Sequence, residues 1–303
     1  MSENKIASVI IPVYGDDFLI ETIDSVLCQD YDPIEIVVIN DKPGLFDAER
    51  FSKYIKLNKE KNIINYLVLS NDTNLGTVKS LNKAISKCKG EIIFTIGGDD
   101  TFYDETVIRK CMERFMDEEL MILTGKRFDY DAQLKKPIRC APSKEEIKII
   151  KKEDCKSLFQ SIAAENYIFG CCTVRRRNVI DRFGLFDERY RFIEDHPSNL
   201  KLLRNGVPIK YIDLVIIKHR SGGVSSAENI DSGYFSEADL IFQNEVIPYV
   251  QSPKVYEKKY SNWKNRTILE RKYRLSKEKN KNRPLLKVFD YVVFRLDKLK
   301  YLG

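Results

Sequence analysis

The chain has 303 residues, of which 43% are hydrophobic and 32% charged, a composition typical of a globular protein with a sizeable buried core. No stretch approaches the roughly 20 apolar residues of a membrane-spanning helix, and a proline interrupts the opening SVIIPV too early for a signal peptide, so we expect a cytoplasmic protein. Seven scattered cysteines show neither a disulfide framework nor paired metal-ligand spacing.

The net charge of +6 is unevenly distributed along the chain. From residue 251 onward, 16 Lys and Arg face 5 Asp and Glu, which gives this segment +11 and leaves −5 for residues 1–250. The basic character therefore belongs to the C-terminal segment, where it suits an anionic surface.

Four short runs rich in β-branched residues predict strands that are buried on both faces. They are SVIIPV (8–13), IEIVVI (34–39), INYLVL (64–69) and EIIFTI (91–96). Helical patterns lie between several of them, with one apolar face formed by Leu19, Ile23, Val26 and Leu27, and another by Val78, Leu81 and Ile85. This alternation predicts an α/β fold with a mainly parallel central sheet, helices on both faces, and ligands at the carboxyl ends of the strands.

Capping residues indicate where the next helices begin and end. We expect Asp104 to cap a helix through Phe115, so that residues 97–103 form a strand-to-helix loop. Residues 127–141 lose periodicity and predict no element. In EDHPSNLKLLRNG, Pro197 suits a first helical turn and Gly206 a C-terminal cap, so a loop followed by a helix is expected.

Acidic residues stand at three comparable places in this fold: Asp41 after a strand, Asp99 and Asp100 after another, and Glu194 with Asp195 before a helix. Adjacent carboxylates at a strand end can hold Mg²⁺ or Mn²⁺ together with substrate phosphates. The alternatives also stand: Asp41, Asp99 and Asp100 suit polar turns, and Glu194 and Asp195 suit a helix cap.

Taken together and in order, these motifs resemble a family 2 glycosyltransferase of the GT-A fold, a Rossmann-like nucleotide-diphospho-sugar transferase. The resemblance covers about residues 6–226. It rests on SVIIPVYG (8–15), IEIVVINDKPG (34–44), NLGTVKSLNKAISKCKGEIIFTIGGDD (74–100), GLFDERYRFIEDHPSNLKLLRNG (184–206) and, loosely, KHRSGGVS (218–225).

The resemblance implies a glycosyltransferase domain over residues 1–226, with nucleotide-sugar binding in about 1–125 and acceptor binding with the catalytic base in 126–226. Donor contacts would come from Pro12, Val13 and Tyr14 beside the nucleoside, Asp41 on the base and Asp99 on the ribose. Asp99 and Asp100 would hold Mn²⁺ or Mg²⁺ on the donor diphosphate.

The second acidic motif supplies the proposed base in such enzymes. Asp195 would remove the proton of the acceptor hydroxyl, Glu194 would position it, and a single displacement would invert the anomeric carbon. This chain departs from the pattern at Gly97, where many relatives carry an acid, and at Arg220, where relatives often place histidine. We therefore keep both His219 as a metal or diphosphate ligand and Arg220 as a phosphate contact.

Residues 227–303 are expected to form a basic helical extension. An apolar side with basic flanks suits an anionic membrane surface, and packing on the main domain or in a homo-oligomer is the alternative. Nucleic acid is not an expected partner, because no binding module accompanies the charge. The apolar side comprises Leu286, Val288, Phe289, Val292, Val293 and Leu296.

The sequence therefore predicts an inverting transferase that moves sugar from a nucleotide-sugar to a saccharide acceptor. A UDP-sugar is the expected donor. A membrane-bound tail would make that acceptor lipid-linked, as in cell-surface polysaccharide synthesis of the O-antigen or capsule type, and would place the enzyme peripherally on the inner face of the membrane. The alternatives are a sugar-nucleotide nucleotidyltransferase, which would need a glycine- and arginine-rich loop where IPVYGDDF stands, and a non-catalytic nucleotide-sugar-binding subunit.

Overall fold

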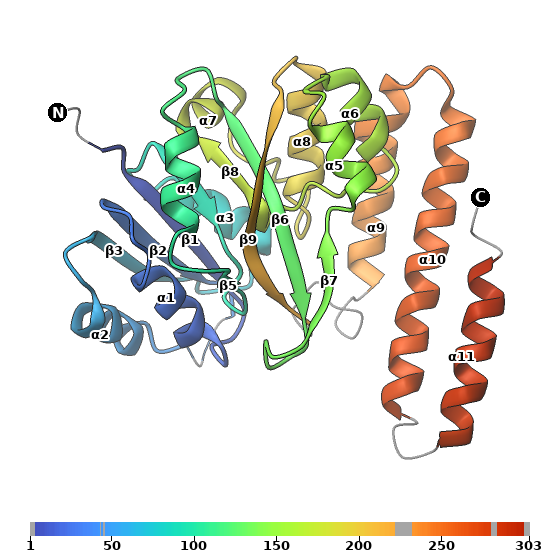
Figure 1. Cartoon of the computed structure of the whole chain (residues 1–303), viewed down its shortest axis with the longest axis horizontal. Coiled ribbons are helices and arrows are strands. Elements are labelled where there is room, and N and C mark those ends of the chain that lie inside the picture. Colours follow the sequence, from blue (N-terminus) through green and yellow to red (C-terminus); the bar gives the residue numbers. More distant parts are fainter. Residues whose placement is uncertain (1–3, 43, 45, 222–231, 280–283, 300–303) are drawn as a thin grey trace. The chain divides into compact units, whose positions relative to one another are not determined.

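The computed structural model describes residues 4–42, 44, 46–221, 232–279 and 284–299 (Figure 1). The chain forms two compact units, residues 1–159 with 167–221 and residues 160–166 with 222–303. Through the first five strands the elements are β1 (Ala7–Val13), α1 (Leu19–Leu27), β2 (Ile34–Asn40), α2 (Ala48–Asn58), β3 (Ile63–Ser70), α3 (Thr77–Ile85), β4 (Ile92–Thr95) and β5 (Thr101–Phe102).

The remaining elements lead into the second unit. They are α4 (Val107–Arg114), β6 (Ile122–Tyr130), β7 (Pro137–Ala141), α5 (Lys144–Ile150), α6 (Cys155–Ile162), the 3₁₀ turn Gly170–Cys172, β8 (Thr173–Arg176), α7 (Arg177–Phe183), α8 (Asp195–Arg204), β9 (Ile209–Arg220), α9 (Ser232–Ile241), the π-helical turn Phe242–Val246, the 3₁₀ turn Ile247–Tyr249, α10 (Pro253–Lys279) and α11 (Pro284–Leu299).

The strands of the first unit form one sheet in the order β3-β2-β1-β4-β8-β6-β9-β5, with β7 beside β6. Strands β1 to β4 pair in parallel, as the β-branched runs predict, and β6 pairs in parallel with β9. Strand β8 runs antiparallel to both β4 and β6, and thereby joins the two parallel groups. The predicted α/β fold with a mainly parallel sheet is confirmed.

Helices cover both faces of the parallel half, because alternate residues of its strands point to opposite sides. On one face Ile11 and Ile36 pack with Ile23 of α1 and Phe51 of α2. On the other, Ile10, Val37 and Ile93 pack with Leu81 and Ile85 of α3. These buried layers fix the carboxyl ends of β1, β2 and β4, where the acidic motifs begin.

Three local expectations differ from the structure. Thr101 and Phe102 form β5, which pairs with β9, where a plain loop was expected. Helix α4 begins at Val107, so Asp104 is not its N-cap; its Oδ1 accepts hydrogen bonds from the backbone N–H and hydroxyl of Thr106 instead. Residues 127–141 belong to the β6–β7 hairpin, in which the second half of β6 is partly buried throughout and β7 is exposed at four of five positions, so no apolar period arises.

The second unit contains the predicted helical extension. Asp239 of α9 accepts hydrogen bonds from Tyr260 and Lys264 of α10, and the Tyr273 ring of α10 stacks on Phe294 of α11 with centroids 4.3 Å apart. No described helix is both long enough and apolar enough to cross a bilayer. The side chains of Leu286, Val288 and Phe289 lie outside the described part, whereas Val292, Val293 and Leu296 are exposed.

Candidate functional site

The turn that carries Asp99 and Asp100 is attached to the end of β1. Gly98 donates its N–H to the Pro12 carbonyl at 3.0 Å, and a Cβ at Gly98 would lie 2.9 Å from a Val13 methyl. A Cβ at Gly97 would lie 2.9 Å from Asp99 Oδ1 and 3.4 Å from Asp100 Oδ2. Both carboxylates therefore face the space above Gly97, which a side chain at this position would fill.

The two carboxylates have different surroundings. Asp100 is buried, accepts the Arg220 N–H at 2.8 Å, and lies 3.0 Å from His219 Nδ1. Burial opposes the charged imidazole, yet the Asp100 carboxylate raises the pKa of His219 to about 9, so the two form an ion pair at neutral pH. Burial and the Asp100 charge raise the pKa of Asp99 to about 6, and the opposing charges of His219 and Arg220 do not offset this rise.

These residues fit a divalent metal held partly by substrate. Among the described residues, no group of three or more His, Cys, Asp or Glu side chains is placed to hold an ion by itself. Asp99 and Asp100 nevertheless point to one place, and no described side chain donates a hydrogen bond to the Asp99 carboxylate. A site of one or two carboxylates that is completed by phosphates is typical of Mg²⁺. His219 already contacts Asp100 through Nδ1.

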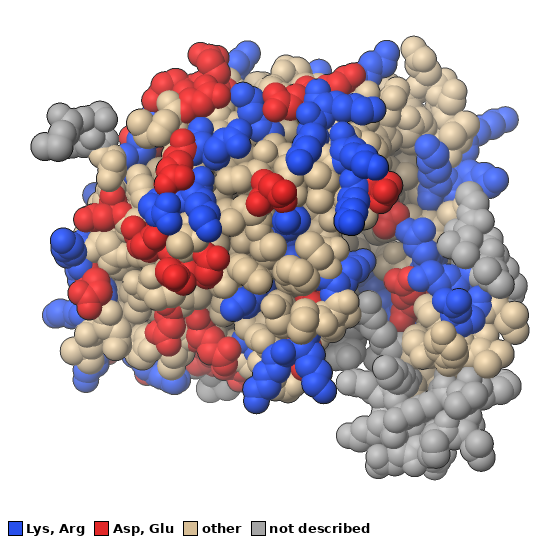
Figure 2. Space-filling model, viewed as in Figure 1, with Lys and Arg blue, Asp and Glu red and all other residues tan. Residues whose placement is uncertain are grey.

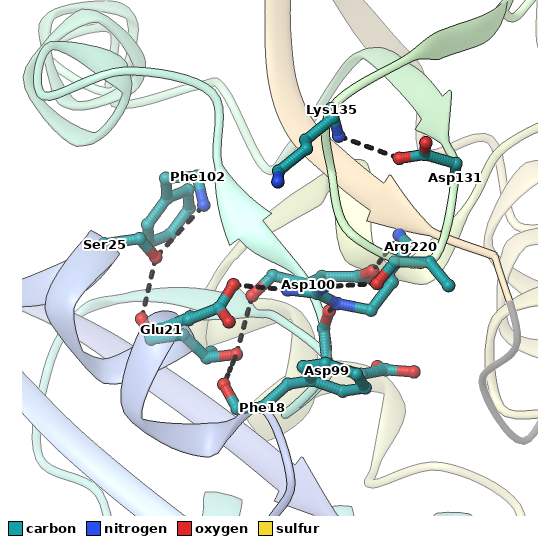
Figure 3. Close-up of polar contacts among 11 residues, drawn as sticks. Phe18, Glu21, Ser25, Asp99, Asp100, Phe102, Asp131, Lys135 and Arg220 are labelled. Carbon is teal, nitrogen blue, oxygen red and sulfur yellow. Dashed lines mark hydrogen bonds and ion pairs between the residues drawn. The ribbon is translucent and has the colours of Figure 1, made fainter.

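Arg220 binds the protein through all three guanidinium nitrogens. Nε donates to the Asp99 carbonyl at 2.7 Å, Nη1 to the Ala132 carbonyl at 2.6 Å, and Nη2 to Glu21 Oε2 at 2.6 Å (Figure 3). The guanidinium also lies 3.8 Å from the centroid of the Phe18 ring. Arg220 is 2% exposed, so it ties the Asp99 turn to α1 and to the hairpin turn, and it is not available as the phosphate contact that we considered.

Asp41 follows β2 next to the end of β1, where its N–H donates to the Val13 carbonyl. Its carboxylate accepts the N–H groups of Leu75 and Gly76 at 2.7 and 2.8 Å and the Asn71 amide at 3.0 Å. Asp41 therefore fixes the loop before α3. Tyr14 of the predicted donor set is 52% exposed, with Lys42 Nζ 5.9 Å from its ring centroid, and Pro12 is partly buried.

Glu194 and Asp195 stand at the start of α8: Glu194 is the N-cap residue and Asp195 the first helical residue, so the helix begins earlier than the predicted loop before it implied. Asp195 Oδ2 accepts the Gly170 N–H at 2.9 Å, and Oδ1 accepts the His196 N–H at 2.6 Å. A Cβ on Gly170 would clash with Glu194 Oε1. Burial and the Asp195 charge raise the pKa of Glu194 to about 8.

Three residues of this region are absent from the sequence-based site. Gly170 orients Asp195, as described above. Arg127 of β6 lies 3.8 Å over the Phe169 ring, and its charge acts on that of Asp100. Arg175 of β8 is 4% exposed, its Nε and Nη2 lack hydrogen-bond partners among the described residues, and Glu194 and Asp195 favour its charge. No local pattern distinguishes these arginines from ordinary surface cations, because strand burial is decided by distant segments.

The two acidic groups belong to one site. Gly170, whose N–H binds Asp195, follows Phe169 in the chain, and the Phe169 ring lies 3.8 Å from the guanidinium of Arg127, whose charge Asp100 favours. The structure thus brings together residues about a hundred positions apart in the chain, at the carboxyl ends of the parallel strands and the start of α8.

Comparison with known proteins decides the family. The model of glycosyl transferase family 2 matches residues 8–184, more than half of the chain. The chain belongs to glycosyl transferase family 2. The match spans the motifs that carry Asp41, Asp99 and Asp100 and ends before the Glu194–Asp195 motif, and it confirms the resemblance seen in the sequence.

Curated relatives of this family 2 member carry glycosyltransferase names. The uncharacterized glycosyltransferase EpsJ of Bacillus subtilis (strain 168) is 26% identical over 226 residues, which are 74% of this chain and 63% of that protein. An uncharacterized glycosyltransferase of Rickettsia typhi is 29% identical over 72% of this chain and 64% of its own length. The chain therefore spans somewhat less than two thirds of these relatives.

Solved structures share the fold of this family 2 chain. S. aureus TarS 1-349 in complex with UDP-GlcNAc has a TM-score of 0.61 and 17% identity, over 97% of this chain and 88% of that one. The mannosyltransferase PcManGT from Pyrobaculum calidifontis, in complex with GDP-Man and Mn²⁺, has a TM-score of 0.62 and 13% identity, over 99% and 85%. At these identities the likeness concerns the fold.

Proposed function

We propose that this chain is an inverting glycosyltransferase that moves a sugar from a nucleotide-sugar to a hydroxyl of a saccharide acceptor. The proposed donor is a UDP-sugar. The observation that supports the proposal is the arrangement of two carboxylate pairs: Asp99 and Asp100 face the space over Gly97, and Asp195 is held by Gly170 beside Glu194. Residues 1–125 would bind the donor and 126–226 the acceptor.

Asp195 is the proposed base. The Gly170 and His196 N–H groups orient its carboxylate, which takes the proton of the acceptor hydroxyl. The hydroxyl oxygen bonds to the anomeric carbon while the bond from that carbon to the phosphate oxygen breaks and the nucleoside diphosphate leaves. Attack from the face opposite the leaving group inverts the anomeric carbon.

Glu194 supports this step without adding a second charge. Because burial and the Asp195 charge raise the pKa of Glu194 to about 8, its carboxyl group keeps its proton near neutral pH. A protonated carboxyl can donate a hydrogen bond to the acceptor or to Asp195. Burial lowers the pKa of Arg175 and the charges of Glu194 and Asp195 oppose this, so the buried guanidinium supplies positive charge to the pair.

Asp99 and Asp100 are the proposed ligands of Mn²⁺ or Mg²⁺, and the bound ion would neutralise the charge of the departing diphosphate. The raised pKa of Asp99 supports this role, since a cation would favour its ionised form. His219 stays with Asp100 as an ion pair and sets the position of that carboxylate. Pro12, Val13, Tyr14 and Asp41 would contact the nucleoside.

The test is Asp195→Asn, with Asp181→Asn on the exposed face of α7 as the matched control. Thermal stabilisation by a panel of nucleotide-sugars with Mn²⁺ first selects the donor, because a bound ligand raises apparent stability. Asp195→Asn should then abolish transfer and keep the donor affinity. Unchanged transfer would remove Asp195 as the base, and donor binding without any transfer by the wild type would favour the non-catalytic subunit.

The C-terminal extension, residues 227–303, is proposed to bind an anionic membrane surface and so to bring the enzyme to a lipid-linked acceptor, as in polysaccharide synthesis. Support comes from α11, where Val292, Val293 and Leu296 are 48%, 40% and 60% exposed, and from the charge of +11 after residue 250. Val292→Asp with Leu296→Asp should abolish sedimentation with phosphatidylglycerol vesicles. Val255→Asp on α10, also at an exposed valine, is the control, and unchanged sedimentation of the α11 variant would contradict the proposal.

A further inference from the structure

The turn of the β6–β7 hairpin, residues 131–136, is anchored beside the donor carboxylates. Its Ala132 carbonyl accepts a hydrogen bond from Arg220 Nη1, while Nε of the same guanidinium binds the Asp99 carbonyl. The backbone continues this attachment, since Ser221 donates its N–H to the Tyr130 carbonyl at 3.0 Å. One buried side chain therefore connects the turn to the proposed metal-binding turn.

The conformation of the turn is fixed by Asp131. Its Oδ1 accepts the N–H groups of Lys135 and Lys136 at 2.8 and 3.2 Å, and the Asp131 N–H donates to the Lys136 carbonyl at 3.1 Å. Leu134 adopts a positive φ of 53°, which closes the loop. The Asp131 carboxylate is therefore engaged by the backbone, and in Figure 3 the Lys135 side chain extends from the turn away from it.

The charges of the hairpin leave its two lysines free. Arg127 and Arg139 both lie 2.9 Å from the Asp129 carboxylate, and Lys126 pairs with Asp213. Neither Lys135 nor Lys136 forms an ion pair with a described residue, and both are exposed. Lys and Arg side chains gather at this end of the hairpin in Figure 2. Residues 122–141 hold five Lys and Arg against two Asp, within a segment 1–250 whose net charge is −5.

We propose that Lys135 and Lys136 form a phosphate-binding arm beside the donor carboxylates. The inference rests on the proposed transferase function, which places phosphate at Asp99 and Asp100. Two exposed ammonium groups without an ion pair, on a turn held by hydrogen bonds beside the proposed site for an anion, favour a phosphate ligand over a neutral sugar. The phosphate is either the donor diphosphate or a phosphate on the acceptor.

The experiment compares Lys135→Ser/Lys136→Ser with Lys151→Ser/Lys152→Ser, an exposed lysine pair that follows α5. Calorimetry would measure UDP and uridine with Mn²⁺, and then glucose 1-phosphate and glucose with UDP and Mn²⁺ saturating. In Lys135→Ser/Lys136→Ser, the affinity for either UDP or glucose 1-phosphate should fall about five- to tenfold, because two partly exposed charge contacts are removed. The affinity for the matching phosphate-free ligand, uridine or glucose, should not change.

The outcomes separate the two sources. Weaker UDP binding assigns the arm to the donor diphosphate, and weaker binding of glucose 1-phosphate alone assigns it to a phosphorylated acceptor. If the wild type binds UDP and the Lys135→Ser/Lys136→Ser variant binds UDP and glucose 1-phosphate as tightly as the wild type, the phosphate-binding arm is refuted. An equal loss of affinity in the Lys151→Ser/Lys152→Ser control refutes it too. Both outcomes leave the transferase proposal standing. A wild type that binds no nucleotide overturns the donor site, and the arm falls with it.

Discussion

Gly170, which orients the proposed base, leaves no room for a side chain of its own. Its replacement by alanine would place a methyl carbon inside van der Waals contact of Glu194 Oε1 and 3.4 Å from Asp195 Cβ. The Glu194 carboxyl group would have to move by roughly 1 Å, and it is the end of a side chain, so the fold should persist at a cost of about 1–3 kcal/mol. The Gly170 N–H could still reach Asp195.

The effect on transfer should be much larger than the effect on stability. A displacement of roughly 1 Å at a reacting centre costs about a hundredfold in rate, because the reacting groups leave their aligned geometry. Asp99 and Asp100 do not contact Gly170, so donor affinity should stay within about twofold of the wild type. Gly170→Ala is thus expected to lower kcat with little change in donor KM.

The assay follows release of nucleoside diphosphate, with the thermal midpoint measured in parallel. Gly170→Ala/Glu194→Ala removes the obstructing carboxyl group, so this double variant should regain the midpoint lost by Gly170→Ala without regaining transfer. A Gly170→Ala enzyme with the wild-type rate would refute the steric argument. So would a double variant whose midpoint falls by the sum of the two single losses, since the clash would then not be the cause.

Three further predictions concern the same site. Burial and the Asp195 charge raise the pKa of Glu194 to about 8, so between about pH 4.5 and 8 the folded chain binds a proton that the unfolded chain has lost. The free energy of unfolding therefore falls as pH rises through this range. The thermal midpoint should fall less between pH 5 and 9 for Glu194→Gln than for the wild type. Asp41→Asn replaces a carboxylate that accepts three N–H groups and should cost about 2–3 kcal/mol in thermal unfolding, whereas exposed Asp72→Asn should cost nothing measurable. Arg220→Lys keeps the charge but cannot reach three acceptors, so Mn²⁺-dependent UDP affinity should fall about tenfold in calorimetry, and an unchanged affinity would mean that the clamp does not set the Asp99 turn.

The parallel half of the fold could be predicted because its signals are local. Strands buried on both faces must be continuously apolar, and β1 and β2 are buried along nearly their whole length. The β6–β7 hairpin could not be predicted in the same way. Four residues of β6 are buried and the next five only partly, while four of the five residues of β7 are exposed, so neither strand alternates. Their pairing depends on β8 and β9, which lie far along the chain.

The acidic motifs could be placed from the sequence, but the partners that tune them could not. Arg220 was considered as a phosphate contact because it follows His219 and precedes glycines; its acceptors instead lie 88, 121 and 199 positions away. A guanidinium can satisfy its five N–H groups with phosphate oxygens or with backbone carbonyls, and the local sequence is the same in both cases.

The role of Gly97 could not be predicted from the sequence either. In the sequence it is a missing acid, whereas in the structure any side chain there would enter the space that the Asp99 and Asp100 carboxylates face. A third carboxylate would add repulsion at a place where burial and the Asp100 charge already raise the pKa of Asp99 to about 6. With glycine, the proposed site has two carboxylates beside the positive charge of His219, and the remaining ligands of a bound ion would be phosphate or water oxygens. Metal affinity should therefore depend on the bound nucleotide more strongly than in a site with three acids.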